Sequence, residues 1–306
     1  MKTFLIRRLI ALVPVVFGVV TLVFFIIHAT PGDPVEIMLG ETASPADRDT
    51  LRKELGLDRP LIAQYITFIG SVATGDLGKS FFTNKGVAES IAERYPATVQ
   101  LALCSMALAI IIAIPLGVLA AARKNSAIDT GAMAISLLGV SMPSFWIGPL
   151  LILVFSINLG WFPVAGRGGI ESLVLPSITL GTAMAAILSR LTRSTMIEAL
   201  DEDYIVTARA KGAPSMTILF RHALSNALLP VVTVAGLQMG ALLAGAIITE
   251  TIFAWPGIGR LTLQAITARD YPLAQGCVLT ISLSYVFVNL VVDIVYALVD
   301  PRIRYK

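Results

Sequence analysis

Apolar residues fall into six long runs along the chain, and polar and charged segments separate these runs. A helix needs roughly 20 predominantly apolar residues to cross the hydrocarbon core of a bilayer. Each run is close to this length or longer, so the pattern predicts an all-α integral membrane protein with six transmembrane helices. The predicted spans are Leu9–Ile27, Ala97–Ala121, Thr130–Ile157, Leu173–Leu191, Ala227–Ile248 and Gly276–Val299.

The first run has the charge pattern of a signal peptide, because Lys2, Arg7 and Arg8 precede it. The run is longer than a typical signal-peptide core, and residues 28–31 offer no convincing small-residue cleavage site. We therefore interpret residues 1–29 as a retained transmembrane anchor.

Lysine and arginine are unevenly distributed between the segments that join the spans. With the N-terminus inside the cell, the inner segments carry thirteen of these residues, and the short outer loops carry only Arg167, Arg260 and Arg269. Short loops rich in Lys and Arg stay in the cytoplasm, so both termini are predicted to be cytoplasmic. The long segment 30–96 then lies outside; its charge does not contradict this orientation, because long segments cross largely regardless of charge.

The outer segment 30–96 contains signals for two short helices. Ser44 is a suitable N-cap residue before Pro45, and Gly56 is a stop signal. A second helix is predicted from Pro60; its apolar face lies on the membrane surface or packs against the outer ends of the spans, and packing is the favoured alternative. That face comprises Leu61, Tyr65, Phe68, Ile69 and Val72.

The overall composition agrees with a membrane protein. Of the 306 residues, 56% are hydrophobic and 14% are charged, and the mean hydropathy is +0.81, whereas a soluble domain has about 25% charged residues. The net charge of +3 is too small, and the Lys and Arg residues are too scattered along the chain, to indicate nucleic-acid binding. Cys104 and Cys277 lie in apolar runs and are interpreted as small buried residues. The chain has no HExxH or GxSxG string that would indicate hydrolase chemistry.

Residues 75–80, Gly-Asp-Leu-Gly-Lys-Ser, end like a phosphate-binding loop. The full motif requires a glycine five positions before Gly78, where this chain has Ala73. It also requires a preceding strand and a following helix, which the surrounding residues do not predict. The segment is assigned to the outside, where ATP is scarce, so nucleotide binding by this loop is rejected.

The longest inner loop, 193–226, contains a short helix with its own start and stop signals. Acidic residues 201–203 suit a helix N-terminus, Arg209 and Lys211 suit its end, and Gly212 stops it. A helix of about ten residues is marginal in water unless it packs on a surface. That surface is either the chain's own helix bundle or a partner, and the pattern does not choose between them. After the stop, a helical pattern leads directly into the fifth span.

The spans contain few polar residues and almost no charged ones. Asp293 is the clearest intramembrane acid, and we predict a structural role for it, paired with an arginine or a helix terminus. Glu250 and Arg190 lie close to span ends. Small residues of the fifth span, such as Gly236 and Gly240, predict close helix packing. The candidates for a polar translocation pathway are Ser141, Gln238 and Asn289.

A series of characteristic strings follows in order from the first span to the C-terminus. They are Pro31-Gly32-Asp33-Pro34, Gly56-Leu57-Asp58 with Pro60, Gly75-Asp76-Leu77-Gly78 with Ser80, residues 203–212 with residues 221–230, Trp255-Pro256-Gly257-Ile258-Gly259, Arg269-Asp270-Tyr271-Pro272 and Asp300-Pro301-Arg302. Together these strings resemble the inner-membrane permease subunits of bacterial binding-protein-dependent ABC importers. The resemblance is to the branch that carries dipeptides, oligopeptides, glutathione and nickel.

The resemblance implies a multi-pass bacterial inner-membrane protein with the type I ABC importer permease fold. Its five-helix core would span residues 97–299, after the first span and a periplasmic segment 30–96 with short helices, and 300–306 would form a cytoplasmic tail. The helix in loop 193–226 would be the coupling helix that docks on an ATPase subunit. The coupling residues that the resemblance implies are Glu202, Asp203, Tyr204, Thr207, Ala208, Arg209, Lys211 and Gly212.

The resemblance also implies partners. They are a second homologous permease subunit, two ATP-binding subunits, a periplasmic or lipoprotein solute-binding protein, and the lipid bilayer, with no nucleic acid. No cofactor, metal or catalytic residue is expected on this chain, because ATP and Mg²⁺ would bind the partner subunits.

The coupling loop departs from the wider family's pattern, which is Glu-Ala-Ala, three residues and then Gly. Val206, Thr207 and Ala208 occupy the first three places, and only Ala208 and Gly212 agree. The role of the first glutamate cannot be carried over to Val206. Asp203, one turn earlier, is an acid that could replace it.

The expected function is therefore the transmembrane subunit of an ATP-driven importer for peptides, with glutathione or nickel complexes as alternative cargo. A secondary transporter driven by an ion gradient would need repeated halves and ion ligands at mid-membrane, and the sequence has no convincing repeat and few central charges. An intramembrane enzyme would need a nucleophile–base or metal-ligand pair that these spans do not supply.

Overall fold

The computed structural model describes residues 2–29, 32–40 and 43–299. Regular structure in this part of the chain is helical, apart from one isolated bridge between Lys79 and Gly86. The predicted all-α class is confirmed. The predicted tail 300–306, with the Asp300-Pro301-Arg302 string, and Pro31 lie outside the described residues.

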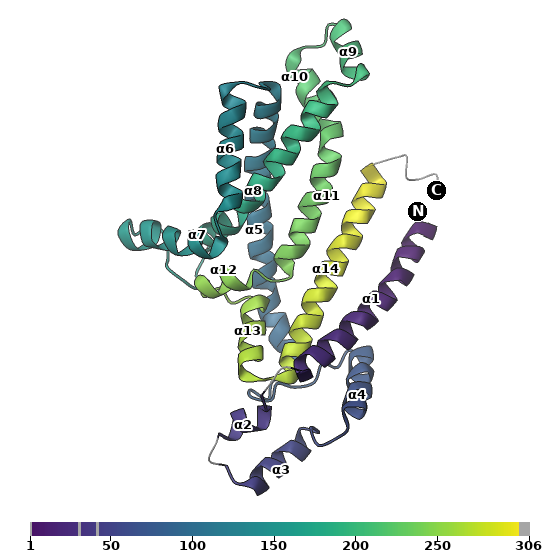
Figure 1. The fold of residues 1–306 in the computed structure, drawn as a ribbon, viewed down its shortest axis with the longest axis vertical. Coiled ribbons are helices and arrows are strands. Elements are labelled where there is room, and N and C mark those ends of the chain that lie inside the picture. The colour runs from purple at the N-terminus through teal and green to yellow at the C-terminus, as the bar shows by residue number, and fades with distance from the viewer. Residues whose placement is uncertain (1, 30–31, 41–42, 300–306) are drawn as a thin grey trace. The chain divides into compact units, whose positions relative to one another are not determined.

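The chain folds into two compact units, and the long helices α5 and α14 contribute to both. The first unit contains residues up to 98 and 256–286, and the second contains 99–255 and the residues from 287 on (Figure 1). The elements of the first unit are α1 (Lys2–Ala29), α2 (Pro34–Leu39), α3 (Pro45–Glu54), α4 (Leu61–Thr74), the start of α5 (Val87–Ala122), α13 (Ile258–Ala268) and most of α14 (Tyr271–Val299). The second unit adds α6 (Ala127–Ser141), α7 (Ser144–Leu151), the π-helix η1 (Ile152–Asn158), α8 (Glu171–Leu200), α9 (Asp203–Ala210), α10 (Ser215–Thr217), the π-helix η2 (Ile218–Ala223), α11 (Leu224–Leu243) and α12 (Ile247–Ile252).

The two helices predicted in the outer segment are present in the first unit. Ser44 caps α3, because its hydroxyl accepts a hydrogen bond of 3.2 Å from the Asp47 amide. The helix ends at Glu54, two residues before Gly56. Helix α4 begins directly after Pro60.

Helix α4 packs against α1, beside which it lies in Figure 1. The ring of Phe24 on α1 contacts the rings of Tyr65 and Phe68, with centroid distances of 5.3 and 5.7 Å. The Tyr65 hydroxyl also shares a hydrogen bond of 2.6 Å with Thr21. The favoured alternative, packing against a span, is therefore confirmed for the central part of the predicted face.

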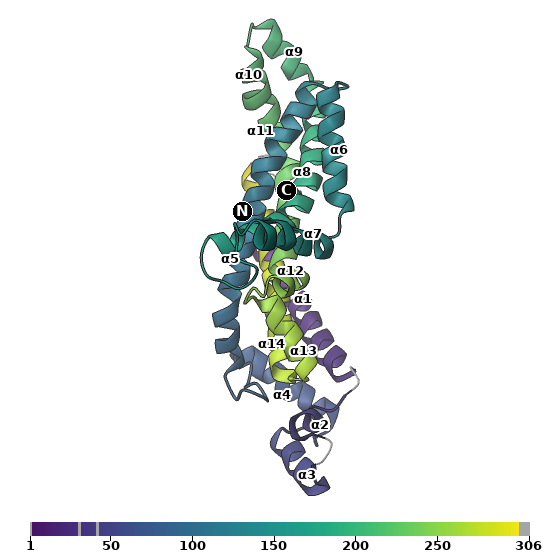
Figure 2. The same cartoon turned by 90° about the vertical axis from the view of Figure 1, so that its left-hand side faces the viewer.

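In the second unit, α8 lies at the centre of the helix bundle, with α5, α6 and α11 around it (Figure 2). The shared core is built mostly from small and unbranched side chains, and the hydroxyls of Ser136 on α6 and Ser189 on α8 share a hydrogen bond of 2.7 Å. Small residues let helix backbones approach closely in a membrane, where lipid is as apolar as the side chains. The buried members of this core are Ala102, Met106, Ala109, Ala113, Ala185, Leu188, Val231 and Leu242.

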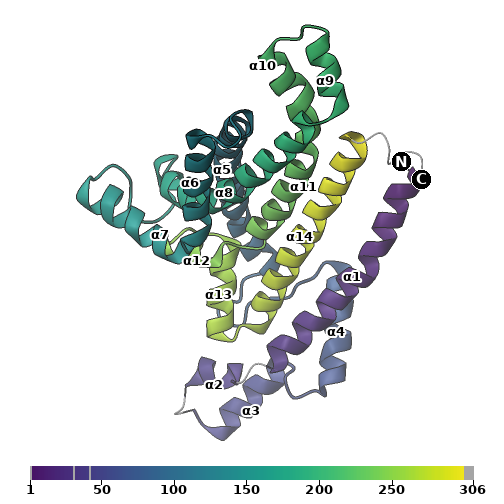
Figure 3. The same ribbon diagram turned by 45° about the horizontal axis from the view of Figure 1, so that its top comes forward.

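The predicted continuous span Thr130–Ile157 is in fact a broken one. Helix α6 ends at Ser141, and the helix that follows from Ser144 is bent from it by 97° (Figure 3). Pro143 explains the break, because a proline disfavours helical backbone at the residue before it. Met142 accordingly has the extended conformation.

The other predicted spans are each present as a long apolar helix, so the described residues hold five such helices, or six if the bent pair counts as one span. Several bounds differ from the prediction: α5 begins at Val87 instead of Ala97, inside the predicted segment 30–96; α8 ends at Leu200 instead of Leu191; and α14 begins at Tyr271 instead of Gly276. The fifth span differs at both ends. It begins at Ser215, twelve residues before the predicted start, and α11 ends at Leu243 instead of Ile248.

Candidate functional site

The predicted coupling helix is α9, Asp203–Ala210. Asp203 lies in its first turn and Arg209 in its last turn, as the charge pattern predicted. Gly212 follows in the left-handed conformation, with φ of 78°. Its amide donates to the Arg209 carbonyl, and the next amide donates to the Ala208 carbonyl. This pair of hydrogen bonds is the Schellman arrangement, for which glycine is the preferred residue.

One side chain of α9 is fully buried. Ile205 has no exposed surface and packs in a cluster with Met196 on α8, Val118 on α5 and Ile218 on η2. Ala208 packs against the same cluster. One side of α9 therefore packs on the chain's own bundle, as the first alternative predicted. The rest of the helix is exposed and is available to a partner, which was the second alternative.

Most of the predicted coupling residues are exposed, and Ala208 is half-buried. Several apolar side chains of the same region are also exposed: Val206 by 59%, together with Tyr204, Met216 and Phe220. Exposed apolar side chains concentrated in one segment are typical of a protein interaction surface. The exposed predicted residues are Glu202, Asp203, Tyr204, Thr207, Arg209, Lys211 and Gly212.

A continuous helix follows soon after α9 and forms the fifth apolar span, as predicted. It runs without interruption from Ser215 to Leu243 through α10, η2 and α11 (Figure 1). The six-residue π segment Ile218–Ala223 lies within it, and π segments are frequent at functional sites.

A charged clamp between α6 and α8 was not predicted from the sequence. Asp129, near the start of α6, is buried, and its carboxylate accepts two hydrogen bonds from the Arg193 guanidinium of α8. The Asn125 amide donates a third, at 2.9 Å. The α5–α6 turn is thereby joined to α8 two turns before α8 ends. The signal available in the sequence was the acid at the start of one predicted span and the arginine at the end of another.

The three pathway candidates all belong to the second unit, but no hydrogen bond or ion pair joins them in the described residues. Ser141 is exposed, and its hydroxyl donates to the Leu137 carbonyl within α6. Asn289 is half-buried in α14. Gln238 on α11 differs from both, because its amide oxygen and nitrogen are buried and have no hydrogen-bond partner.

Asp293, Glu250 and Gly236 are further residues of interest in or near the predicted spans. Asp293 is half-buried in α14, and its structural role stays a prediction. Glu250 is fully buried in α12. Gly236 on α11 confirms the predicted close packing, because a Cβ atom there would lie 2.0 Å from Cγ2 of Val292 on α14.

Three of the family-like strings meet at the turn between α13 and α14. The buried carboxylate of Asp270 accepts hydrogen bonds from the Ser80 hydroxyl at 2.5 Å and the Phe81 amide at 3.2 Å. The hydroxyl of the adjacent Tyr271 donates to the Gly32 carbonyl at 3.2 Å. The loop that ends like a phosphate-binding motif therefore has its serine engaged in holding the outer segment to α13 and α14.

Replacing Asp270 with asparagine should loosen this loop. The Asp270 carboxylate also accepts from the Leu273 amide, and asparagine removes the negative charge that all three donors face. A hydrogen bond to a charged group contributes about 1.5–3 kcal/mol and one between neutral groups about 0.5–1.5 kcal/mol, so the bonds that hold the loop become weaker. Hydrogen exchange of residues 76–86 in the purified protein should become clearly faster. Asp76→Asn is the matched control, because that exposed carboxylate accepts only from Gly78 within the loop; equal exchange in both variants would contradict the role of Asp270.

In the part of the chain that the structure describes, no group of three or more His, Cys, Asp or Glu residues could hold a metal ion. Cys277 is buried and Cys104 is half-buried, and both are free thiols.

Two family models match this chain, one after the other. Residues 113–305 match the binding-protein-dependent transport system inner membrane component, and residues 1–102 match the N-terminal part of such membrane components. The chain belongs to this family. The predicted family, the multi-pass inner-membrane location and the transport role of a permease subunit are confirmed.

Relatives of this permease are similar over their full length. The di/tripeptide transport system permease protein DppB of Pseudomonas aeruginosa is 44% identical over 335 aligned residues, which cover 100% of both chains. The glutathione transport system permease protein GsiC of Escherichia coli K12 is 43% identical over 306 residues, again covering 100% of both.

Solved structures support the permease fold. A chain of the inward-facing methionine ABC transporter MetNI matches with a TM-score of 0.57 at 19% identity, covering 69% of this permease and 96% of that chain. A chain of an amino acid ABC transporter matches with a TM-score of 0.52 at 15% identity, covering 70% and 94%. The predicted ABC importer permease fold is confirmed.

Proposed function

We propose that this permease forms half of the translocation pathway of an ATP-driven importer for short peptides. A second homologous permease subunit completes the pathway, two separate subunits bind and hydrolyse ATP with Mg²⁺, and a solute-binding protein delivers the cargo from outside. The family description supports the dependence on a binding protein. Both termini, α9 and the start of α11 lie on the cytoplasmic side in this proposal, as the distribution of Lys and Arg indicates.

Peptides are the proposed cargo, and glutathione, itself a tripeptide, is the alternative. The names of full-length relatives at 44% and 43% identity support these two. Peptides carry charged termini and amides, whose transfer into hydrocarbon costs several kcal/mol per group. They therefore need a polar path that opens alternately to the two sides.

The coupling mechanism rests on one observation: α9 is anchored through Ile205 and Ala208, its other side chains are exposed, and a continuous helix follows it into the fifth span. An ATPase subunit that covers Val206 and its exposed neighbours moves α9 when it closes on ATP. The movement passes to α11, because a hydrogen-bonded helix transmits displacement along its axis. The apolar Val206 replaces the glutamate of the wider family, so the contact at this place is apolar.

The pathway is proposed to include Gln238, together with Ser141 and Asn289. A buried amide without partners costs free energy, and it therefore favours a state in which α11 moves and the amide meets water or cargo. Asp293 is proposed to be structural, as an acid near the end of a span.

The experiment that tests the coupling assignment replaces Val206 with aspartate. A charge at the centre of an apolar contact should abolish ATP-dependent uptake of a radiolabelled dipeptide into proteoliposomes that contain the complete importer. The chain itself should still insert and fold, because Val206 lies outside the buried core.

The matched control is Ile37→Asp, which introduces the same charge at another exposed apolar residue, on α2 of the outer segment. Co-purification of the ATPase subunits is measured for both variants. Normal uptake and normal co-purification in Val206→Asp would refute the coupling role of α9.

A further inference from the structure

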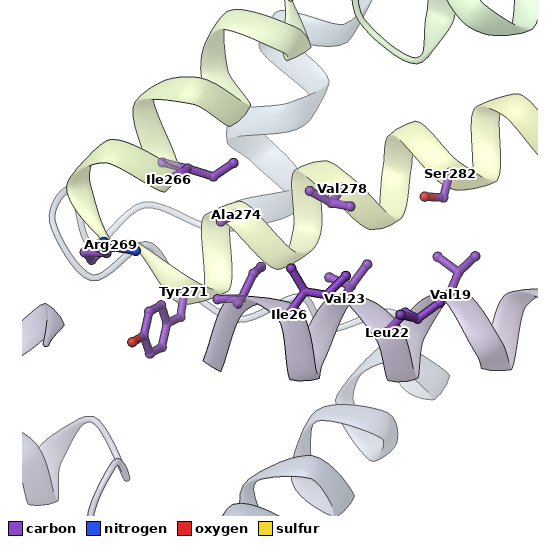
Figure 4. Close-up of a pocket in the computed structure, with 12 residues that line it drawn as sticks. Val19, Leu22, Val23, Ile26, Ile266, Arg269, Tyr271, Ala274, Val278 and Ser282 are labelled. Atoms are coloured by element: carbon purple, nitrogen blue, oxygen red, sulfur yellow. The ribbon is translucent and has the colours of Figure 1, made fainter. Parts of the chain in front are cut away.

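A groove lies between α1 and the α13–α14 hairpin within the first unit (Figure 4). Its volume is about 270 Å³, and its walls are almost entirely aliphatic. In Figure 4, side chains of α1 point across the groove toward Val278 on α14. Leu22 and Ile26 on its α1 wall are 60% and 58% exposed, so the groove opens toward the surroundings of the spans.

The two ends of the groove differ in chemistry. Arg269 and Tyr271 lie together at one end, where α1 finishes at Ala29 and α14 begins, and Ser282 is the polar residue toward the other end (Figure 4). The charged end therefore lies at the level where the spans leave the hydrocarbon, where a tyrosine is typical. The aliphatic remainder extends into the membrane.

The Arg269 guanidinium is positioned at this end but is not neutralised there. In the described residues, no carboxylate forms an ion pair with it; Asp33, in the loop before α2, pairs with Arg52, and Asp270 accepts from Ser80. A Cβ atom on residue 32 would lie 2.8 Å from Nε of Arg269, so the absence of a side chain at Gly32 leaves room for the guanidinium.

An occupant of this groove must be apolar along its length and anionic at the end near Arg269. We propose that the groove binds one acyl chain of an anionic glycerophospholipid, whose phosphate accepts hydrogen bonds from Arg269. The guanidinium is well matched to phosphate, because it offers several donors in a fixed plane. A basic residue at the head of an apolar groove between helices is the charge arrangement that binds phospholipid head groups. The lipid adds to the direct packing of α1 on the α13–α14 hairpin, which Ile27 makes at the end of the groove near Arg269.

The test uses the complete importer in nanodiscs of phosphatidylcholine that contain a small fraction of phosphatidylglycerol with a photoreactive acyl chain. After illumination, labelled residues are mapped by mass spectrometry. Label is expected on the groove residues of α1 and α14. Arg269→Gln should reduce it roughly tenfold, the change expected on losing a charge-assisted hydrogen bond. Val278→Trp fills the groove and should remove the label.

Val13→Trp is the control for added bulk, because Val13 is an exposed residue of α1 outside the groove. Its labelling should equal that of the parent, and co-purification of the partner subunits shows that each variant is assembled. If Arg269→Gln and Val278→Trp are both labelled as strongly as the parent protein, the label reports only lipid that loosely surrounds the spans, and the proposal is overturned. A disulfide between Leu22→Cys and a cysteine of the second permease subunit would also overturn it, because a protein helix would then occupy the groove.

Discussion

Replacing Gly236 with alanine should markedly destabilise the assembled permease, although the change adds one methyl group. The new Cβ atom would lie 2.0 Å from Cγ2 of Val292 and 3.2 Å from its Cβ. Valine cannot turn away easily, because its branched side chain strongly prefers one χ1 rotamer in a helix. Helices α11 and α14 must then separate, and overpacking of this kind costs about 1–3 kcal/mol and occasionally more. Two quantities are measured: the thermal unfolding midpoint of the purified importer in detergent, and the amount of the chain that is inserted in the membrane.

A second substitution makes this prediction specific. Val292→Ala removes the methyl groups that clash, so the double variant Gly236→Ala/Val292→Ala should regain most of the lost stability. Gly131→Ala on α6 is the control, because nothing lies within 4 Å of a Cβ atom there; alanine should be neutral or slightly stabilising at this helix position. If Val292→Ala fails to restore stability, the loss has another cause than this contact.

Breaking the clamp between Asp129 and Arg193 should have an effect of similar size. Arg193→Ala leaves a buried carboxylate with one remaining donor, the Asn125 amide. Removing one partner of an ion pair that is shielded from water is destabilising, because it leaves the other charge without its partner, and the partial exposure of Arg193 moderates the loss. Because the clamp holds α6 to α8 near the end of α8 that leads to α9, the proposed coupling helix, dipeptide uptake should fall together with stability.

The design for this pair is a double-mutant cycle with Asp129→Ala, Arg193→Ala and both changes together. The double variant should be more stable than Arg193→Ala alone, because it leaves no unpaired charge. The neighbouring pair of Lys124 and Asp201 provides the control, since both side chains are at least half exposed and 3.7 Å apart. Lys124→Ala should cost less than about 1 kcal/mol. Additive effects of Asp129→Ala and Arg193→Ala would contradict the clamp.

Much of the fold could be predicted because the signals are local. A span is recognised from about twenty consecutive apolar residues. The starts and ends of α3 and α9 depend on hydrogen bonds within a few residues, such as Ser44 to the Asp47 amide and the turn at Gly212. The break at Pro143 was equally local but was missed, because counting apolar residues does not register the restraint that proline places on Met142.

The candidate site could be predicted only in part. The position of α9 followed from the sequence, but its single buried residue, Ile205, did not, because periodicity over eight residues cannot tell which side meets the bundle. The family-like strings predicted the family, but they did not show which contacts the residues of each string make. Only the fold shows that Ser80 and Asp270, 190 residues apart, form one hydrogen bond.

Local chain chemistry alone decided that this protein is a helical membrane protein with a short capped helix before its fifth span, because apolar length, caps and glycine turns act over a few residues. Tertiary structure alone decided which residues act in pairs across helices: Asp129 with Arg193, Gly236 against Val292, and the aliphatic groove that ends at Arg269. The physical reason is that hydrogen-bond partnership and close packing depend on the register between helices. That register is set by the summed contacts of whole helices, which no single stretch of the chain encodes.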